Sequence, residues 1–313
     1  MTSLAPIFEL TPGATISPAS GSVQNFTTPV RYTVTSEDKA WHRVYAITAR
    51  EQKASNIPTT YHFEKVRIMQ NVWQEFYEEQ DSGNELTWAS GNKGFKWAMS
   101  EAATEDYPTT QIDNGKTGKC VKLETRLTGD LGNMVGMPIA AGNLFIGSFD
   151  MLNAITNPLS ATRFGTPFYN KPLRLTGYYK YKAGEQFYEN GEYTSRKDIF
   201  NIYAIFYDGV KYDSAGKGTD VTLDGNLPNQ NYEHSSMVAL ALVSNPQETE
   251  GDEWKFFDIP FDYQRYGKKI DEARLAKGEY KIGIIFASSK DGATFEGAPG
   301  STLLIDEVEL IYE

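Results

Sequence analysis

The stretch Tyr280-Lys281-Ile282-Gly283-Ile284-Ile285-Phe286-Ala287 is apolar at almost every position and rich in β-branched and aromatic residues. Residues 202–207 have the same character. Successive side chains of a β-strand point to opposite faces of its sheet, so a strand that is apolar on both faces needs cover on both. Both stretches therefore predict central strands of a sheet with both faces buried.

Turn-forming pairs separate runs of this kind along the chain, as in Asn114-Gly115, Asp208-Gly209 and Asp291-Gly292. Glycine supplies positive φ in such turns, and Asn or Asp hydrogen-bonds its own backbone. Helical candidates are few, and the clearest is residues 271–277, which begin with acids, end with bases and precede Gly278. The pattern predicts an all-β chain with many hairpins.

A polar segment, residues 51–60, divides the 313-residue chain. Residues 1–55 carry short strand-like runs between Pro/Gly/Ser-rich turns, which predict an Ig-like β module. Because a full immunoglobulin sandwich needs about 100 residues, this module should be small, with four or five strands. Residues 60–313 are long for one domain, but single all-β domains reach that length.

Composition excludes several function classes. The 30 Lys and Arg against 41 Asp and Glu give a net charge of -11, which disfavours nucleic acid and anionic lipid as partners. A single cysteine excludes thiolate metal clusters, and three scattered histidines form no local zinc motif. Since the N-terminus shows no leader pattern, the protein is either cytosolic or begins after a removed leader.

Two strand-like runs carry a carboxylate where alternation predicts an apolar side chain. Asp306 shares the apolar face of residues 303–312 with Val308, and Glu64 points where Val66 points. A buried carboxylate must be paired, hydrogen-bonded or metal-bound. Glu64, Asp306 and loop carbonyls would suit a structural calcium ion. The alternative is that Asp306 caps a turn or accepts backbone N–H bonds.

Glu307 and Glu309 alternate with Asp306 and are expected on the opposite face of the same strand. Paired carboxylates at this spacing can serve glycoside hydrolysis, which makes the two residues candidates for catalysis. The alternative is that they are solvated charges on a terminal strand.

Aromatic residues are abundant, with 19 Tyr, 17 Phe and 5 Trp. Sugar rings present C–H faces and hydroxyls, so an aromatic platform flanked by amides suits a carbohydrate. The alternative is an aromatic sandwich core. Two groups of candidate sugar-binding residues follow from the spacing: Trp88, Asn92, Trp97 and Tyr107, and then Tyr178 and Tyr181.

Six stretches share their order with a known family: Trp88–Phe95, Tyr107–Thr109, Ala141–Gly147, Gly165–Phe168, Pro172–Tyr181 and Gly297–Leu310. Together they resemble the putative carbohydrate metabolism domain of Bacteroides-type gut anaerobes over about residues 60–313. The resemblance implies a small Ig-like N-terminal module followed by a jelly-roll β-sandwich akin to carbohydrate-binding modules. It also implies a surface or secreted lipoprotein whose leader and lipid-bearing cysteine are absent from this chain.

The resemblance strengthens the calcium hypothesis, because similar modules hold a structural calcium where the first and last strands meet. It brings no catalytic residues, although some family members are described as putative glycoside hydrolases. The function we expect is therefore non-catalytic binding of an oligo- or polysaccharide at the cell surface by a monomer, in glycan capture or utilisation, with no required cofactor. A glycoside hydrolase with a carboxylate pair and a purely structural or adhesive surface protein remain as alternatives.

Overall fold

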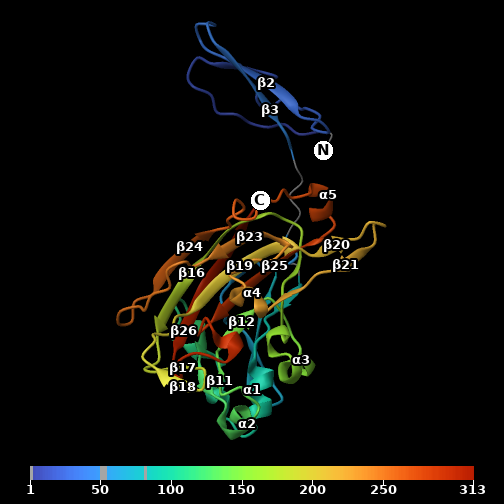
Figure 1. Cartoon of the computed structure of the whole chain (residues 1–313). Coiled ribbons are helices and arrows are strands. Elements are labelled where there is room, and N and C mark those ends of the chain that lie inside the picture. Colours follow the sequence, from blue (N-terminus) through green and yellow to red (C-terminus); the bar gives the residue numbers. More distant parts are fainter. Residues whose placement is uncertain (1–2, 50–54, 81–82) are drawn as a thin grey trace. The chain divides into compact units, whose positions relative to one another are not determined.

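The computed structural model describes residues 3–49, 55–80 and 83–313 (Figure 1). The chain divides into two compact units, residues 1–54 and residues 55–313. Within the described ranges, no helix has the length and apolar character that crossing a membrane requires.

The N-terminal unit contains one antiparallel sheet in the order β1-β2-β3, formed by Thr15–Ser17, Val30–Thr35 and His42–Ile47. Tyr32 of β2 is buried and its ring centroid lies 4.7 Å from that of Phe8. The side chains of β3 are mostly exposed. Residues 3–49 thus hold three strands where four or five were expected, and they pack around a very small core.

The larger unit is a sandwich of two antiparallel sheets, so the all-β prediction is confirmed. One sheet has the order β12-β25-β19-β23, and β15 also pairs with β25. These strands are Asn143–Phe145, Tyr280–Ala287, Asn201–Asp208, Met237–Leu242 and Thr166–Phe168. The other sheet has the order β24-β16-β26-β9-β8, and β4 also pairs with β26. These strands are Lys255–Pro260, Pro172–Lys182, Thr302–Tyr312, Lys119–Glu124, Thr109–Asp113 and Thr60–Tyr61.

The two stretches that predicted central strands are β25 and β19, which are neighbours in the five-stranded sheet. On one face, Ile284 and Phe206 belong to the core between the two sheets. On the other face, Tyr203 and Ile285 belong to a second apolar cluster with Phe164. The prediction that both faces of these strands are buried is confirmed.

Shorter elements complete the unit. Three small sheets comprise β5-β6-β7 (Val66–Met69, Trp73–Glu79, Glu85–Thr87), β13-β14-β22 (Gly147–Phe149, Thr162–Phe164, Leu223–Asp224) and β10-β11 (Arg126–Leu127, Ile139–Ala140). Two hairpins are β17-β18 (Phe187–Glu189, Glu192–Thr194) and β20-β21 (Val210–Tyr212, Gly218–Asp220). The α-helices are α1 (Asn92–Ala98), α2 (Gly129–Met134), α3 (Met151–Thr156), α4 (Asn226–Asn229) and α5 (Glu272–Leu275), and the 3-10 turns are η1 (Thr104–Asp106), η2 (Pro158–Ser160) and η3 (Gly292–Thr294).

Helices α1, α2 and α3 gather with the β17-β18 hairpin at one end of the sandwich (Figure 1). The predicted helix at residues 271–277 is the single turn α5, where the Asp271 side chain accepts hydrogen bonds from the Ala273 and Arg274 amides at 2.9 and 3.2 Å. Asp271 is thus an N-cap residue that satisfies two amides of the first turn.

A β-bulge changes the phase of β26. Its pairing with β16 runs from Thr176 opposite Glu309 to Tyr178 opposite Asp306, so two residues face Gly177 alone, and Glu307 has a φ of 48°. Such a bulge shifts all later side chains to the other face. The inward side chains are therefore Leu303 and Ile305 before the bulge and Val308 and Leu310 after it. The prediction that Asp306 shares a face with Val308 is wrong for this reason.

Gly177 lies opposite the bulge with no room for a side chain, because an added Cβ would lie 2.7 Å from the Phe257 ring and 2.9 Å from Val308 Cγ2. We expect Gly177→Ala to lower the free energy of unfolding by about 1–3 kcal/mol through overpacking. Urea unfolding of the whole chain measures this, with Lys182→Ala at the exposed end of the same strand as the control. Equal stability of the two variants would show that the bulge adapts to a methyl group.

Candidate functional site

Two hollows lie beside each other at the end of the sandwich that carries α1, α2 and α3. We call the first the tyrosine cleft; its lining includes Leu127, Gly129, Asn133, Gly136, Pro138, Tyr188, Asn190, Gly191, Tyr193, Thr294, Phe295 and Glu296. We call the second the apolar pocket; it is lined mainly by α1, α3, η3 and the segment between α2 and β12. Phe295 lines both hollows.

The β17-β18 hairpin positions the two tyrosines of the cleft. Its loop is Asn190-Gly191, and both residues have positive φ, 52° and 88°, as a two-residue hairpin loop of the I′ type requires. Tyr188 and Tyr193 therefore lie directly opposite each other, with ring centroids 5.3 Å apart and ring planes at 73°. The backbone of Tyr188 exchanges two hydrogen bonds with Gly297, which fixes the hairpin to the domain.

The cleft combines ring surface with amide, hydroxyl and carboxylate groups. Tyr193 lines the cleft and is 52% exposed. Asn133 of α2, Asn190 of the loop and Glu296 add side chains that can exchange hydrogen bonds with hydroxyl groups. An aromatic platform flanked by such groups suits a flat ligand that has one C–H face and many hydroxyls.

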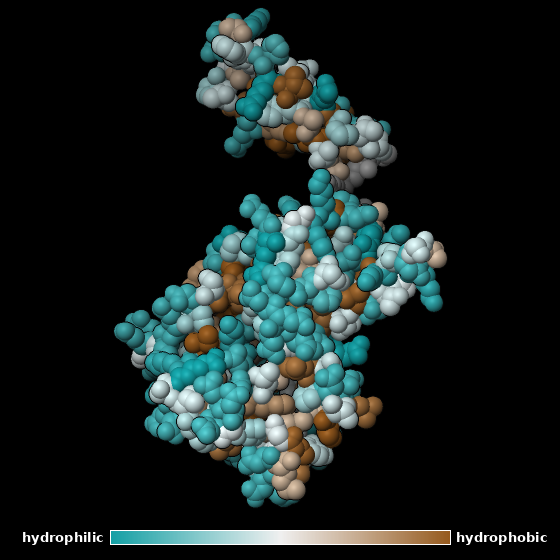
Figure 2. All heavy atoms as spheres, viewed as in Figure 1, coloured by the Kyte–Doolittle hydropathy of each residue, from teal (hydrophilic) through white to brown (hydrophobic). Residues whose placement is uncertain are grey.

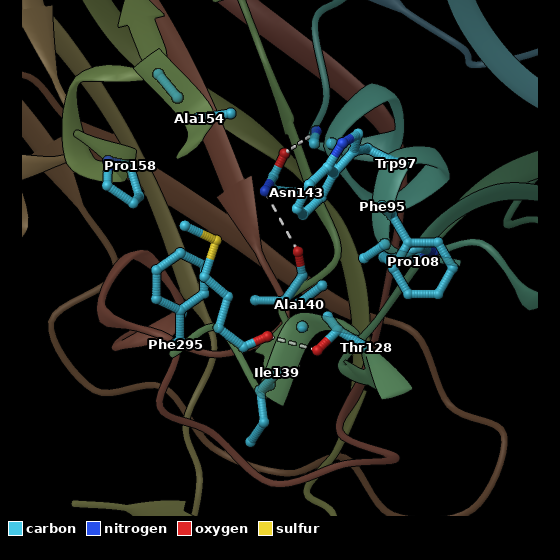
Figure 3. A pocket seen from close by; sticks show the side chains of 18 of the residues that line it. Phe95, Trp97, Pro108, Thr128, Ile139, Ala140, Asn143, Ala154, Pro158 and Phe295 are labelled. Carbon is cyan, nitrogen blue, oxygen red and sulfur yellow. Dashed lines mark hydrogen bonds between the residues drawn. The ribbon is translucent and has the colours of Figure 1, made fainter. Parts of the chain in front are cut away.

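The apolar pocket offers different chemistry (Figure 3). No Asp, Glu, Lys, Arg or His occurs among its described lining residues. Its largest side chains are Phe95, Trp97, Met137, Phe149, Met151 and Phe295. With no ionisable group on its walls, this pocket holds neither a general acid nor a general base.

Four of the predicted sugar-binding residues are core residues, so the platform prediction is wrong for them. Trp88 is buried against Tyr61, with ring centroids 5.1 Å apart, and it also packs on Phe63 and Phe286. Asn92 is buried. Its side-chain oxygen accepts a hydrogen bond from the Thr109 N–H at 3.1 Å, and its side-chain NH₂ donates one to the Thr109 carbonyl at 2.7 Å.

Tyr107 packs on Phe95 with ring centroids 5.4 Å apart, and Tyr181 packs on Phe200 at 4.9 Å. Both tyrosines are buried, so neither presents a ring face on which a sugar could stack.

Trp97 and Tyr178 keep exposed surface but lie in different places. Trp97 is 39% exposed and lines the apolar pocket. Tyr178 is half-buried on the outer face of the six-stranded sheet, 5.1 Å from the exposed ring of Phe256 between centroids. The Lys116 ammonium lies 4.8 Å from the Tyr178 centroid and covers part of that ring. Of the predicted second group, Tyr178 thus forms an aromatic pair with Phe256 on a sheet face, whereas Tyr181 lies in the core.

Glu64 and Asp306 both accept hydrogen bonds from the β8-β9 turn. The Lys119 N–H lies 2.8 Å from Glu64 Oε1, and the Thr117 N–H lies 3.0 Å from Asp306 Oδ2, while Asp306 Oδ1 accepts from the Glu307 N–H at 2.8 Å. Among the described residues no group of three or more His, Cys, Asp or Glu side chains forms. The contacts match the alternative that Asp306 accepts backbone N–H bonds, and the calcium site stays a prediction.

Glu64 is exposed rather than turned toward the core as Val66 is, because β4 ends at Tyr61 and Phe63 adopts a positive φ of 55°. The predicted alternation across residues 62–66 is therefore interrupted. A residue with positive φ also interrupts the alternation between Glu307 and Glu309. Glu307 is the bulge residue and its carboxylate lies 2.9 Å from His62 Nδ1, whereas Glu309 is exposed on the outer face.

Raised carboxyl pKa values, the mark of a general acid, occur away from both hollows. Burial raises the pKa of Glu75, Glu78 and Asp198, and it raises the pKa of Asp306 to about 6. None of the four lines the tyrosine cleft or the apolar pocket. Glu78 accepts from the Phe63 N–H, and Asp198 accepts from the Ala298 N–H and two serine hydroxyls, so both are buried structural acceptors.

The tyrosines of the cleft were missed in the sequence. The signal was present, because Asn190-Gly191 between Tyr188 and Tyr193 is a strong two-residue hairpin pattern that presents both rings on one face. The contribution of Asn133 had no such signal, since it depends on how α2 approaches the hairpin.

Comparison with protein families gives two matches. The model of the putative carbohydrate metabolism domain matches residues 62–311. The model described as SGBP, N-terminal, where SGBP stands for surface glycan-binding protein, matches residues 1–49. The search of curated proteins gives no significant match.

Two solved structures are similar to the chain. One, described as a putative glycoside hydrolase from Bacteroides vulgatus ATCC 8482, is 50% identical with a TM-score of 0.76, and the match covers 83% of this chain and 100% of the other. The second, described as a putative glycoside hydrolase from Bacteroides thetaiotaomicron VPI-5482, is 46% identical with a TM-score of 0.73, and the match covers 100% of this chain and 87% of the other.

The buried Asp306 predicts a pH dependence of stability. With its pKa raised from 3.8 to about 6, the folded chain keeps a proton that the unfolded chain loses near pH 4, so stability falls as pH rises from about 4 to 6. We expect Asp306→Asn to remove this contribution: over that range, wild type should lose about 1–3 kcal/mol relative to the variant. Urea unfolding at several pH values measures the difference. Glu309→Gln on the same strand is the control, and a pH-independent difference for Asp306→Asn would contradict the assignment.

Proposed function

Since the chain belongs to the family of the putative carbohydrate metabolism domain, we propose that it is a non-catalytic glycan-binding protein whose binding site is the tyrosine cleft. The observation that carries the proposal is the Tyr188–Tyr193 pair, held by a rigid two-residue hairpin and flanked by Asn133, Asn190 and Glu296. A rigid platform binds a sugar ring with little loss of conformational entropy.

The chemistry of the cleft supports binding rather than hydrolysis. Glycoside hydrolysis requires two carboxyl groups that flank the scissile bond at about 5–9.5 Å from each other. Glu296 is the one carboxylate among the described residues that line the tyrosine cleft. The Glu307 carboxylate is bonded to His62 Nδ1, and the β-bulge breaks the alternation that would place Glu307 and Glu309 on one face. The two similar structures are described as putative glycoside hydrolases, so hydrolysis is the alternative that an assay must address.

The match of residues 1–49 to the N-terminal part of a surface glycan-binding protein supports a place at the cell surface. We propose that the chain is held there as an outer-membrane lipoprotein and that the N-terminal unit is a spacer between the anchor and the larger domain. Its small core around Tyr32 suits a spacer better than a second ligand site.

The test is retention of the whole chain on an array of plant and host polysaccharides, followed by affinity measurement on each polysaccharide that binds. We expect Tyr193→Ala to weaken binding by about 10- to 30-fold, the loss typical of an exposed aromatic hot spot. Because Tyr193 is half exposed, its removal should leave the fold unchanged.

Two control variants test whether another exposed aromatic ring is the binding site. Phe256→Ala removes the 54% exposed ring beside Tyr178, and Tyr212→Ala removes an exposed tyrosine of the β20-β21 hairpin. Both variants should bind as wild type does. Loss of binding in Phe256→Ala with Tyr193→Ala unaffected would move the site to the sheet face, and no retention of any polysaccharide would contradict the proposal. Release of reducing sugar from a bound polysaccharide would favour the hydrolase.

A further inference from the structure

The apolar pocket is distinct in chemistry from the tyrosine cleft. Two of its polar side chains are already bonded to the protein: the Asn143 amide oxygen accepts from the Gly91 N–H at 2.8 Å and its NH₂ donates to the Ala141 carbonyl at 3.3 Å (Figure 3). The Thr128 hydroxyl donates to the Met137 carbonyl (Figure 3). A ligand therefore meets ring and aliphatic surface with few free directional partners, which disfavours a sugar.

The pocket exists because small residues line it. Ten of its 24 described lining residues are glycine or alanine, among them Ala98 of α1, Ala154 of α3 and Ala293 of η3. At Gly94 an added Cβ would lie 3.2 Å from the Phe149 ring, and at Gly292 it would lie 2.3 Å from Ala141 Cβ. These glycines allow the surrounding elements to approach closely, and the space between them stays open.

The volume limits the ligand. The cavity measures about 130 Å³. An apolar cavity of about 150 Å³ in another protein stays dry and takes up a single benzene molecule. A benzene-sized group fits this space, whereas a polar sugar ring would lose its hydrogen bonds to water there.

The mouth of the pocket is unusually apolar for a protein surface. Trp97, Val135 and Ile155 line the pocket and are partly exposed, while Met134 and Leu152 on the same helices are 83% and 85% exposed. Figure 2 shows hydrophobic residues gathered at the end of the unit that carries these helices. Contiguous exposed apolar surface of this kind marks a ligand or partner site.

The segment around α2 separates the pocket from the tyrosine cleft. Thr128, Gly132, Val135 and Met137 face the pocket, whereas Leu127, Gly129, Asn133, Gly136 and Pro138 face the cleft. Phe295, whose φ of 60° is unusual for an aromatic residue, lines both. A single ligand that passes the Phe295 side chain could therefore occupy both hollows.

We propose that the apolar pocket binds a single apolar group of about the size of benzene. The group has two potential sources: a free small aromatic compound, or an aromatic substituent on a glycan whose sugar lies in the tyrosine cleft. The second source rests on the proposed function, whereas the first does not.

The test uses benzene itself as the probe with the whole chain, and follows Trp fluorescence, to which Trp97 in the pocket wall contributes, and the midpoint of thermal unfolding. Wild type should show saturable binding and a raised midpoint. Ala154→Phe fills the pocket from α3 and should weaken benzene binding by about tenfold or more. The matched control is Thr156→Phe, which places the same ring on the same helix at an exposed residue outside the pocket lining and should bind as wild type does.

Ala293→Leu fills the pocket from η3 and serves if Ala154→Phe does not fold. No saturable binding of benzene to wild type, or unchanged binding in both filled variants, would overturn the proposal. Because this assay contains no sugar, it stands whether or not the tyrosine cleft binds a glycan.

The source is resolved with the phenyl and methyl glycosides of a sugar that the wild type retains. Tighter binding of the phenyl glycoside that is lost in Ala154→Phe, with binding of the methyl glycoside unchanged, supports the glycan substituent. Equal binding of the two glycosides beside saturable binding of benzene supports a free aromatic ligand.

Discussion

Burial of both faces of β19 and β25 is the constraint on which the larger unit depends. Each fully buried aliphatic or aromatic side chain contributes about 1.5–3 kcal/mol, and these strands carry such residues on both faces. The six-stranded sheet covers one face. The other face needs a third layer, which β14, β22 and α4 supply through Phe164, Leu223 and Leu227. The short elements outside the two sheets are therefore part of what keeps the central strands out of water.

The apolar pocket and the tyrosine cleft lie among the short elements outside the two sheets. The chain segments between β7 and β15 carry α1, α2 and α3, which lie at one end of the sandwich. The residues that these elements turn toward the apolar pocket include many glycines and alanines, which leave the space open. Neighbouring residues of the segment around α2 line the apolar pocket and the tyrosine cleft, and Phe295 lines both. The polar and the apolar surface therefore lie side by side.

The regular parts of the fold could be predicted from the sequence, and the positions of single side chains could not. Alternation and turn pairs sufficed for the all-β class and for β19 and β25, and the order of acids, bases and Gly278 sufficed for the helical turn at Asp271. Alternation failed at Phe63 and Glu307, because a non-glycine residue with positive φ carries no sequence mark. The bulge at Glu307 then reversed the expected face of Asp306, although this carboxylate is buried as expected.

Aromatic residues show the same limit in another form. Trp88 and Tyr193 are both plausible sugar-binding residues by type, and only their depth separates them: one packs on Tyr61 in the core, and the other lies at the tip of a hairpin. Local turn chemistry was the better guide, since Asn190-Gly191 fixes which residues face each other across the hairpin. A binding site on such a hairpin needs few tertiary contacts to present its rings. Its specificity must then come from the neighbours, Asn133 and Phe295, that only the folded chain brings to it.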